Sequence, residues 1–250
     1  MKTEWDYTNL AEAYLLRPDY APSAISQMLE QAGVRPGDAA CDVGAGAAHL
    51  TLELAKFGLR VSAVEPNDAM RANGIKRTSE YPQVQWFEGV GEHTGMDDNQ
   101  FELVTFGSSF NVCDRQMALS ETNRILKPGG YFACMWNHRD LDDPLQKEIE
   151  GIIQSNIAGY TYGTRREDQT AVIDQSGLFG KVIFLQGTVT HRLDADDFIE
   201  GWKSHGTVYR QSPEVFEKII GEIRSLVHGL HQQTILVPYT TRIWMAQTKK

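Results

Sequence analysis

One stretch of the sequence decides the fold: Asp42-Val43-Gly44-Ala45-Gly46-Ala47-Ala48-His49. It joins an apolar run of strand length, residues 39–43, to a helical stretch, residues 47–57. Two glycines at the junction let the backbone turn tightly and approach a ligand closely, while the following helix presents its free N–H groups at the same point. The pattern therefore predicts a strand, a turn and a helix at a ligand-binding edge, with a plain tight connection as the alternative.

Short apolar runs of strand length alternate with helical stretches around this turn. The expected strands are residues 39–43, 59–64, 84–87, 103–106 and 131–136, and the expected helices between them are residues 47–57, 68–79 and 115–126. Alternation at this spacing produces βαβ units, whose parallel strands form one sheet buried between helices. Such a sheet binds ligands at the carboxyl ends of its strands. The sequence therefore predicts an α/β fold with a mostly parallel sheet.

Turn residues mark the ends of several expected elements. Two helices are expected before the first strand, at 11–17 and 23–32, the second capped by Ser23 and closed by Gly33. The turn Lys127-Pro128-Gly129-Gly130 contains a proline that cannot continue a helix and two glycines that tolerate positive φ. This turn makes Tyr131 the expected first residue of the fifth strand.

The regular alternation stops between residues 141 and 177, where polar, mostly helical sequence follows. We expect this segment to be a mostly helical insertion over the active site, with 1–140 and 178–250 forming the core. Later elements are expected as strands at 181–188 and 239–247 and helices at 194–203 and 213–231.

Composition limits the classes of partner. Of the 250 residues, 41% are hydrophobic and 23% charged, which suits one sizeable α/β domain with a modest addition. The formal net charge of −9 disfavours nucleic acid as a partner, because that affinity is built from Lys and Arg. A monomer and a homodimer are equally compatible with the sequence.

The sequence contains no segment that we expect to be a targeting signal, a membrane span or a metal site. Glu4, Asp6 and Glu12 interrupt the apolar residues at the start, and no run reaches the roughly 18 apolar residues of a membrane span. We therefore expect a cytoplasmic protein. The three cysteines form no CxxC pair and the histidines no ligand group, so no metal is assigned; Cys41 and Cys134 are expected as buried free thiols.

An acidic residue follows the glycine turn at an informative distance. Glu65 closes the second expected strand about 20 residues after Gly46, the spacing at which a carboxylate meets ribose hydroxyls in nucleotide-binding βαβ folds. A carboxylate can accept hydrogen bonds from both hydroxyls. The dinucleotide fingerprint needs a third glycine where His49 stands, so NAD or FAD binding is disfavoured.

Two runs resemble the class I S-adenosylmethionine-dependent methyltransferases: CDVGAGAAHLTLELAKFGLRVSAVEPNDAM (41–70) and FELVTFGSSFNVCDRQMALSETNRILKPGGYFACMWN (101–137). The resemblance covers residues 9–137 and is greatest to the small-molecule branch that includes the trans-aconitate methyltransferases. It implies a Rossmann-like sheet of seven mostly parallel strands with helical N-terminal and lid additions. It also implies S-adenosylmethionine as cofactor and methyl transfer to a small molecule, with oxygen ahead of nitrogen or carbon.

The resemblance assigns most of the cofactor contacts to loops after the strands. It places Asp42, Gly44 and Gly46 at the methionine part, Glu65 at the ribose, Asn67 and Met70 at the adenosine side, Gly91 and Glu92 over adenine, and Gly107 under the sulfonium. The run AEAYLLRPDY (11–20) matches an N-terminal pattern of the branch, so Tyr14 and Arg17 cover the cofactor and Arg17 pairs with its carboxylate. For Tyr14, helix packing is an equal alternative.

One departure from the branch motivates a second hypothesis. A His-Trp pair commonly follows the fourth strand in that branch, and Asn111-Val112 stands in its place here. The alternative function is a non-catalytic protein that binds S-adenosylmethionine or another nucleotide.

Methyl transfer requires alignment in a dry pocket more than it requires a base. No obligatory catalytic residue stands out, and His138 is the candidate if a base is used. The acceptor-binding candidates follow strand ends or surround a glycine, and they are Asn111, Trp136, His138, Trp202, His205 and Tyr209. Ordinary surface or connecting positions are the alternative for these residues. Tyr160, Tyr162, Arg165 and Arg166 in the insertion are further candidates.

Overall fold

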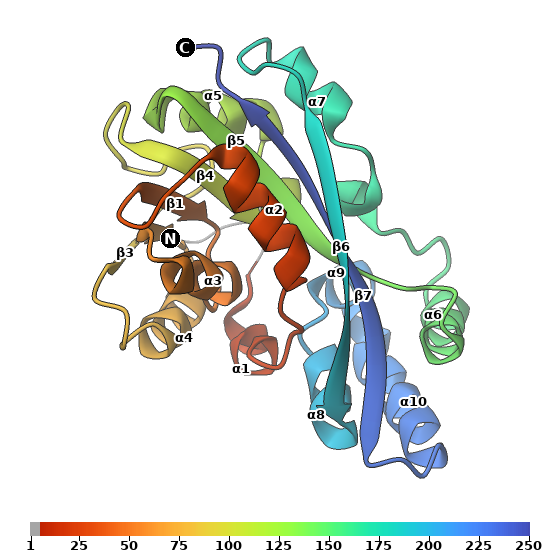
Figure 1. The fold of residues 1–250 in the computed structure, drawn as a ribbon. Helices are drawn as coiled ribbons and strands as arrows, with labels where there is room; N and C mark the ends of the chain where they lie inside the picture. Colours follow the sequence, from red (N-terminus) through yellow and green to blue (C-terminus); the bar gives the residue numbers. More distant parts are fainter. Residues whose placement is uncertain (1–5) are drawn as a thin grey trace.

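Seven strands form one mixed sheet in the order β3-β2-β1-β4-β5-β7-β6 (Figure 1). The structure is a computed structural model and describes residues 6–250. The strands are β1 (Ala39–Val43), β2 (Arg60–Val64), β3 (Val84–Phe87), β4 (Phe101–Gly107), β5 (Leu126–Arg139), β6 (Ile183–Asp194) and β7 (Thr234–Gln247). Strands β1 to β5 pair in parallel, and β7 runs antiparallel to both β5 and β6. The predicted mostly parallel α/β sheet is confirmed.

Helices cover both faces of the sheet. They are α1 (Ala11–Tyr14), α2 (Pro22–Ala32), α3 (His49–Phe57), α4 (Asp68–Arg77), α5 (Arg115–Ile125), α6 (Pro144–Asn156), α7 (Thr170–Gln175), α8 (Ala195–Trp202), α9 (Gly206–Gln211) and α10 (Phe216–Gly229), with 3-10 helices η1 (Thr8–Leu10), η2 (Phe110–Val112), η3 (Gly163–Arg166) and η4 (Pro213–Val215). None of the helices in the described range is both long and apolar enough to cross a membrane.

Alternation along the buried strands supplies two cores. On β4, Leu103 packs in one core with residues of α2 and α3, while its neighbour Val104 packs in the other with residues of α5 and α7. Successive side chains of a strand point to opposite faces, so a strand buried on both faces is apolar throughout. The strand order reverses between β1 and β4, which is where open α/β sheets bind ligands.

A third core lies beyond the parallel strands. The far ends of β6 and β7 extend past the rest of the sheet, and α8, α9 and α10 lie along them (Figure 1). Helix α6 shares this apolar cluster with α8 and α10, through Ile149, Phe198 and Ile223. Helix α6, the first helix of the 141–177 segment, thus shares a helical layer with the C-terminal part of the chain, whereas α7 packs on the core with α5.

Several predicted boundaries were wrong for identifiable reasons. Strand β5 begins at Leu126, not at Tyr131, because Leu126 already pairs with Phe101 before the register shifts and resumes at the Leu103–Tyr131 pair. Gly129, at φ +77°, carries the intervening turn. Helix α1 ends at Tyr14 instead of continuing to residue 17, because residues 15–17 form tighter turns in which each N–H bonds to the carbonyl three residues earlier.

The second helix also begins differently from its prediction. Helix α2 starts at Pro22 with Ala21 as N-cap, so Ser23 is not the cap, whereas Gly33 closes the helix at φ +66° as predicted. The Ala21 N–H donates to Thr241 Oγ1 of β7 at 2.7 Å. This hydrogen bond fixes the start of the helix on the sheet.

Gly187 of β6 allows α2 to lie directly on the sheet. A Cβ at this position would lie 2.4 Å from Ser23 Oγ and 2.8 Å from the Ala24 backbone nitrogen. The chain enters α2 from residues 14–20, so the position of this helix sets one wall of the site described below.

Replacing Gly187 with alanine should therefore force α2 and β6 apart. We expect Gly187→Ala to lower the free energy of unfolding by about 1–3 kcal/mol, the usual effect of overpacking, in urea denaturation. Gly221→Ala is the matched control, because nothing lies within 4 Å of a Cβ there. In helix α10 it should instead be neutral or raise stability by up to about 1 kcal/mol. Equal effects of the two changes would contradict the argument.

Candidate active site

Two adjoining chambers open at the carboxyl ends of the parallel strands. The glutamate chamber, of about 480 Å³, is lined by Gly44, Gly46, Glu65, Met70, Gly91, Glu92 and residues 107–109 and 111–114, among others. The arginine chamber, of about 140 Å³, is lined by parts of residues 14–20, by Trp136 to Arg139, and by Arg165, Arg166, Trp202 and His205, among others. Tyr7, Tyr14, Gly44, Gly46, Gly107, Ser108 and Asn111 line both chambers.

The predicted glycine turn lines both chambers. Gly44 and Gly46 have φ values of +68° and +55°, which side chains with a Cβ rarely adopt. The N–H groups of Gly44 and Ala45 both donate to the Val64 carbonyl, at 2.8 and 3.0 Å. A Cβ on Gly44 would lie 2.4 Å from Ser109 Cβ. Only glycine therefore lets these strand ends meet so closely.

Glu65 lies buried at the end of β2 in the glutamate chamber. Its two carboxylate oxygens accept hydrogen bonds from the backbone N–H groups of Gly46 and Asn67, each at 2.8 Å. Burial raises the pKa of Glu65, and these two N–H groups oppose that rise. Each oxygen keeps further lone-pair capacity, so the side chain can accept two hydroxyl hydrogen bonds from a ligand.

Two further residues that the resemblance places at the cofactor have protein partners of their own. Asn67 is the N-cap of α4, because its Oδ1 accepts from the Met70 N–H at 3.0 Å and its Nδ2 donates to Thr8 Oγ1 at 3.0 Å. Asp42 faces the arginine chamber, where its carboxylate accepts hydrogen bonds from Thr51 and Thr105 at 2.7 and 3.0 Å. Burial raises the pKa of Asp42 to about 6, against these hydroxyl donors.

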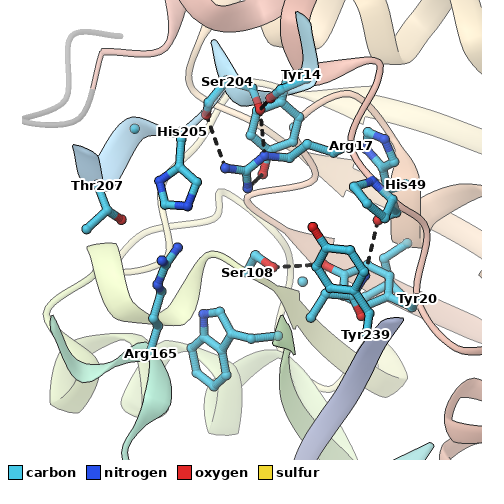
Figure 2. Close-up of a pocket in the computed structure, with 18 of the residues that line it drawn as sticks. Tyr14, Arg17, Tyr20, His49, Ser108, Arg165, Ser204, His205, Thr207 and Tyr239 are labelled. Atoms are coloured by element: carbon cyan, nitrogen blue, oxygen red, sulfur yellow. Dashed lines mark hydrogen bonds between the residues drawn. The ribbon is translucent and has the colours of Figure 1, made fainter. Parts of the chain in front are cut away.

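Arg17 also lines the arginine chamber and joins two distant segments. Its Nε donates to Ser204 Oγ at 2.9 Å, and its Nη2 donates to the Ser204 carbonyl at 3.1 Å. The guanidinium stacks on the Tyr14 ring at 4.4 Å (Figure 2). These donors connect Arg17 to the α8–α9 connection, and the predicted pairing of Arg17 with a cofactor carboxylate stays a prediction.

Most of the predicted acceptor residues meet in the arginine chamber. Asn111 Oδ1 accepts from Trp136 Nε1 at 2.8 Å on the shared wall. Trp202 and His205 stack with ring centroids 5.1 Å apart and planes at 9°. His138 is buried, and neither of its ring nitrogens has a hydrogen-bond partner among the described residues.

Tyr209 does not join the predicted acceptor residues. It is 37% exposed and packs edge-on against Phe216. Helix α9 turns its Val208 face inward, which leaves the next residue on the outer side.

Other lining residues had a weaker sequence signal or none. Tyr20 lies with its hydroxyl 3.1 Å from Ser108 Oγ, close to Tyr239 (Figure 2). Tyr7 also lines the chamber. Tyr20 falls in the 11–20 run that resembles the methyltransferase branch. Tyr239 lies in the middle of a strand, where no local pattern distinguishes a pocket residue from a packed one.

Positive charge dominates the arginine chamber. Arg17, Arg139, Arg165 and Arg166 all line it. Burial lowers the pKa of His138 to about 3 and that of His205 well below its usual value, and the surrounding arginines add to both shifts. Both histidines are therefore neutral at physiological pH.

The described residues, 6–250, contain no group of three or more His, Cys, Asp or Glu side chains placed to hold a metal ion. Cys41 and Cys134 are buried free thiols, as predicted.

The fold and the site define a class of protein. The sheet order, the glycine turn and the acid that ends β2 make up the Rossmann-like fold of class I methyltransferases, and solved structures with that fold superpose on most of this chain. The YcgJ protein from Bacillus subtilis has a TM-score of 0.58 at 17% identity, covering 91% of this chain and 99% of its own. Phosphoethanolamine N-methyltransferase 2 of Haemonchus contortus, in complex with S-adenosyl-L-methionine, has a TM-score of 0.57 at 16% identity, covering 100% and 59%.

Sequence relatives point to the same class. Residues 41–134 match the methyltransferase domain family. An uncharacterized methyltransferase of Mycobacterium tuberculosis is 36% identical over 124 residues, covering 50% of this chain and 48% of its own. A demethylmenaquinone methyltransferase of Staphylococcus aureus is 33% identical over 113 residues, covering 44% and 47%. The chain thus spans about half the length of the curated relatives it matches.

These comparisons support S-adenosylmethionine as the cofactor, in agreement with the prediction. They do not distinguish branches of the class, so the resemblance to trans-aconitate methyltransferases stays a prediction.

The buried neutral histidines should make the fold sensitive to acid. Because the folded-state pKa of His138 lies near 3, below the value of about 6.5 in an unfolded chain, its contribution to stability is complete above pH 6.5 and is lost as pH falls toward 3. Between pH 7 and 5 that loss is about 2 kcal/mol. We expect His138→Gln to reduce the loss of unfolding free energy over this range by that amount in urea titrations.

The control for this experiment is His93→Gln, a change at an exposed histidine, which should leave the pH dependence unchanged. Asp42 has a raised pKa and acts in the opposite direction, but it is common to both variants and cancels in the comparison. A wild-type pH dependence in His138→Gln would show that His138 is not held neutral.

Glu65→Gln should weaken the affinity for S-adenosylhomocysteine by about 1–3 kcal/mol in calorimetry, because charge-assisted hydrogen bonds to the ribose are lost. Glu80→Gln removes the same charge at an exposed position beyond α4 and should leave the affinity unchanged. Unchanged affinity in both variants, with both folded, would refute the ribose assignment.

Proposed function

We propose that this protein transfers a methyl group from S-adenosylmethionine to a small-molecule acceptor, with oxygen ahead of nitrogen or carbon as the accepting atom. The observation that carries the proposal is the arrangement of the two chambers. The glutamate chamber contains Glu65 and adjoins the arginine chamber along a wall made by Gly107, Ser108 and Asn111. A methyl donor in one chamber and a methyl acceptor in the other can therefore meet beside these shared residues.

The glutamate chamber fits the proposed cofactor. Glu65 offers two oxygens to ribose hydroxyls, Gly91 and Glu92 supply the opposite side, and the glycine turn leaves room for close approach. S-adenosylmethionine supplies the methyl carbon, whose bond to sulfur breaks as an acceptor lone pair bonds to it, so that sulfur keeps the electron pair in S-adenosylhomocysteine. The chain itself orients the acceptor and excludes water.

The neutral histidines limit the part that a base can play. His138 lines the arginine chamber with two unpartnered ring nitrogens, so it can hydrogen-bond to an acceptor. With a pKa near 3 it is a poor proton acceptor. An acceptor with an ionised oxygen or a neutral amine needs no base. The preference for oxygen therefore rests on the resemblance alone.

The segments that cover the arginine chamber are also part of this proposal. We assign it to residues 14–20, to η3 of the 141–177 insertion and to the connection after α8, all of which line the arginine chamber. The assignment to the trans-aconitate-type branch also belongs here, and it rests on the resemblance over residues 9–137.

Ligand-dependent stabilisation tests the proposal directly. A ligand that binds only the folded state raises the thermal midpoint by mass action. We expect S-adenosylmethionine and S-adenosylhomocysteine to raise the midpoint of this protein and NAD to leave it unchanged. A rise with NAD alone, or with none of the three ligands, would refute it. Cofactor binding without stoichiometric S-adenosylhomocysteine formation from any acceptor would favour the non-catalytic binding protein suggested by Asn111-Val112.

A further inference from the structure

The four arginines of the arginine chamber differ in their partners. Arg139 forms an ion pair with Glu150 at 3.1 Å. Arg17 is bonded to Ser204, and Arg166 donates to the Arg139 carbonyl at 3.2 Å, so both have neutral hydrogen-bond partners. The chamber therefore holds more positive charge than its own carboxylates balance.

Arg165 is the least compensated of these cations. Within the described residues no hydrogen bond or ion pair joins it to another side chain; its guanidinium lies over the Tyr162 ring at 5.2 Å. Its side chain reaches from η3 toward His205 (Figure 2). Burial lowers the pKa of Arg165 to about 10, and Arg17, Arg139 and Arg166 contribute to the shift. A cation in such a setting costs stability unless a ligand supplies the anion.

The position of Arg165 separates it from the place of methyl transfer. The residues that line both chambers include Gly107, Ser108 and Asn111, whereas Arg165 and its neighbour His205 line only the arginine chamber. A group bound at Arg165 thus lies in the arginine chamber and outside the glutamate chamber. The methyl-accepting atom has to lie at the shared wall, within reach of the glutamate chamber.

We propose that the acceptor is a carboxylic acid whose carboxylate is an anchor held by Arg165 beside His205, while a different atom of the molecule receives the methyl group at the shared wall. The separation of anchor and accepting atom rests on the proposed methyl transfer, whereas the carboxylate site itself does not. A guanidinium presents a planar fork that matches a carboxylate with two parallel hydrogen bonds. The aromatic rings of Trp136, Trp202 and Tyr239 supply walls for the body of the acceptor.

Matched small aromatic probes test the anchor by binding alone. The probes are 4-hydroxybenzoate, 4-methoxybenzoate, methyl 4-hydroxybenzoate, 4-hydroxybenzamide and 4-hydroxyphenyl phosphate, each measured by thermal shift and calorimetry with and without S-adenosylhomocysteine. We expect the two free carboxylates to bind and the ester and amide to bind at least tenfold more weakly. Equal binding of the ester or amide, preference for the phosphate, or binding of no probe would overturn the proposal.

Variants of Arg165 separate an anchor from a structural residue. Arg165→Gln should weaken carboxylate binding about tenfold to a hundredfold, the range for a charge-assisted pair, and leave the affinity for S-adenosylhomocysteine unchanged. The ligand-free variant should be as thermostable as the wild type or more so, because an uncompensated cation is removed. Arg192→Gln, at an exposed position of β6, is the charge-matched control and should change neither affinity.

The two proposals can fail independently. Carboxylate binding that depends on Arg165, in a protein that does not bind S-adenosylhomocysteine, would support the anchor and refute the methyltransferase function. Binding of S-adenosylhomocysteine together with unchanged carboxylate affinity in Arg165→Gln would leave the methyltransferase function standing and overturn the anchor.

Discussion

The meeting of three strand ends at the glycine turn is the constraint on which both chambers depend. Gly44 and Ala45 bind the last carbonyl of β2, and Ser109, just after β4, donates to the Val43 carbonyl at 2.5 Å. Ser109 occupies the space that a Cβ on Gly44 would need. The result is a close meeting of β1, β2 and β4, at which Gly44 and Gly46 line both chambers. A side chain at Gly44 would clash with Ser109 and disturb this meeting.

The arginine chamber has a distribution of charge that is not expected in a cavity without a function. Guanidinium groups gather around His138 and His205, which burial holds neutral, and among the described residues only Arg139 of these arginines has a carboxylate partner. Stability alone would favour apolar residues or full pairing at these positions. Features that lower stability tend to remain at functional sites. The same field that makes His138 a poor base stabilises an anion brought in by a ligand.

The sequence predicted the cofactor half of the molecule more completely than the acceptor half, and the difference is physical. The β1 turn, Glu65 and the parallel strands follow from local periodicity and turn chemistry, which a short window contains. Asn67 caps α4 through a local hydrogen bond to the Met70 N–H, a role that the sequence pattern also allowed. Tyr209 lies on the surface because α9 packs its Val208 face inward, which depends on tertiary packing. Tyr239 reaches the pocket only because β7 pairs with the end of β5. No short stretch of the sequence contains both strands, so local patterns cannot predict this pairing.

The division between the two chambers also explains which part of the site the similarity to known proteins informs. The matched domain, residues 41–134, contains the glycine turn, Glu65 and the loop at Gly91, and therefore the glutamate chamber. Arg165, Trp202 and Tyr239 lie outside it, on η3, α8 and the extended pair β6–β7. Helix α8 and the far ends of β6 and β7 pack on a core formed with α6 and α10, while the rest of β6 and β7 belongs to the two cores of the main sheet. Under the proposed function, acceptor choice therefore depends on residues outside the matched domain, and the charges and rings that these residues present are the evidence for it.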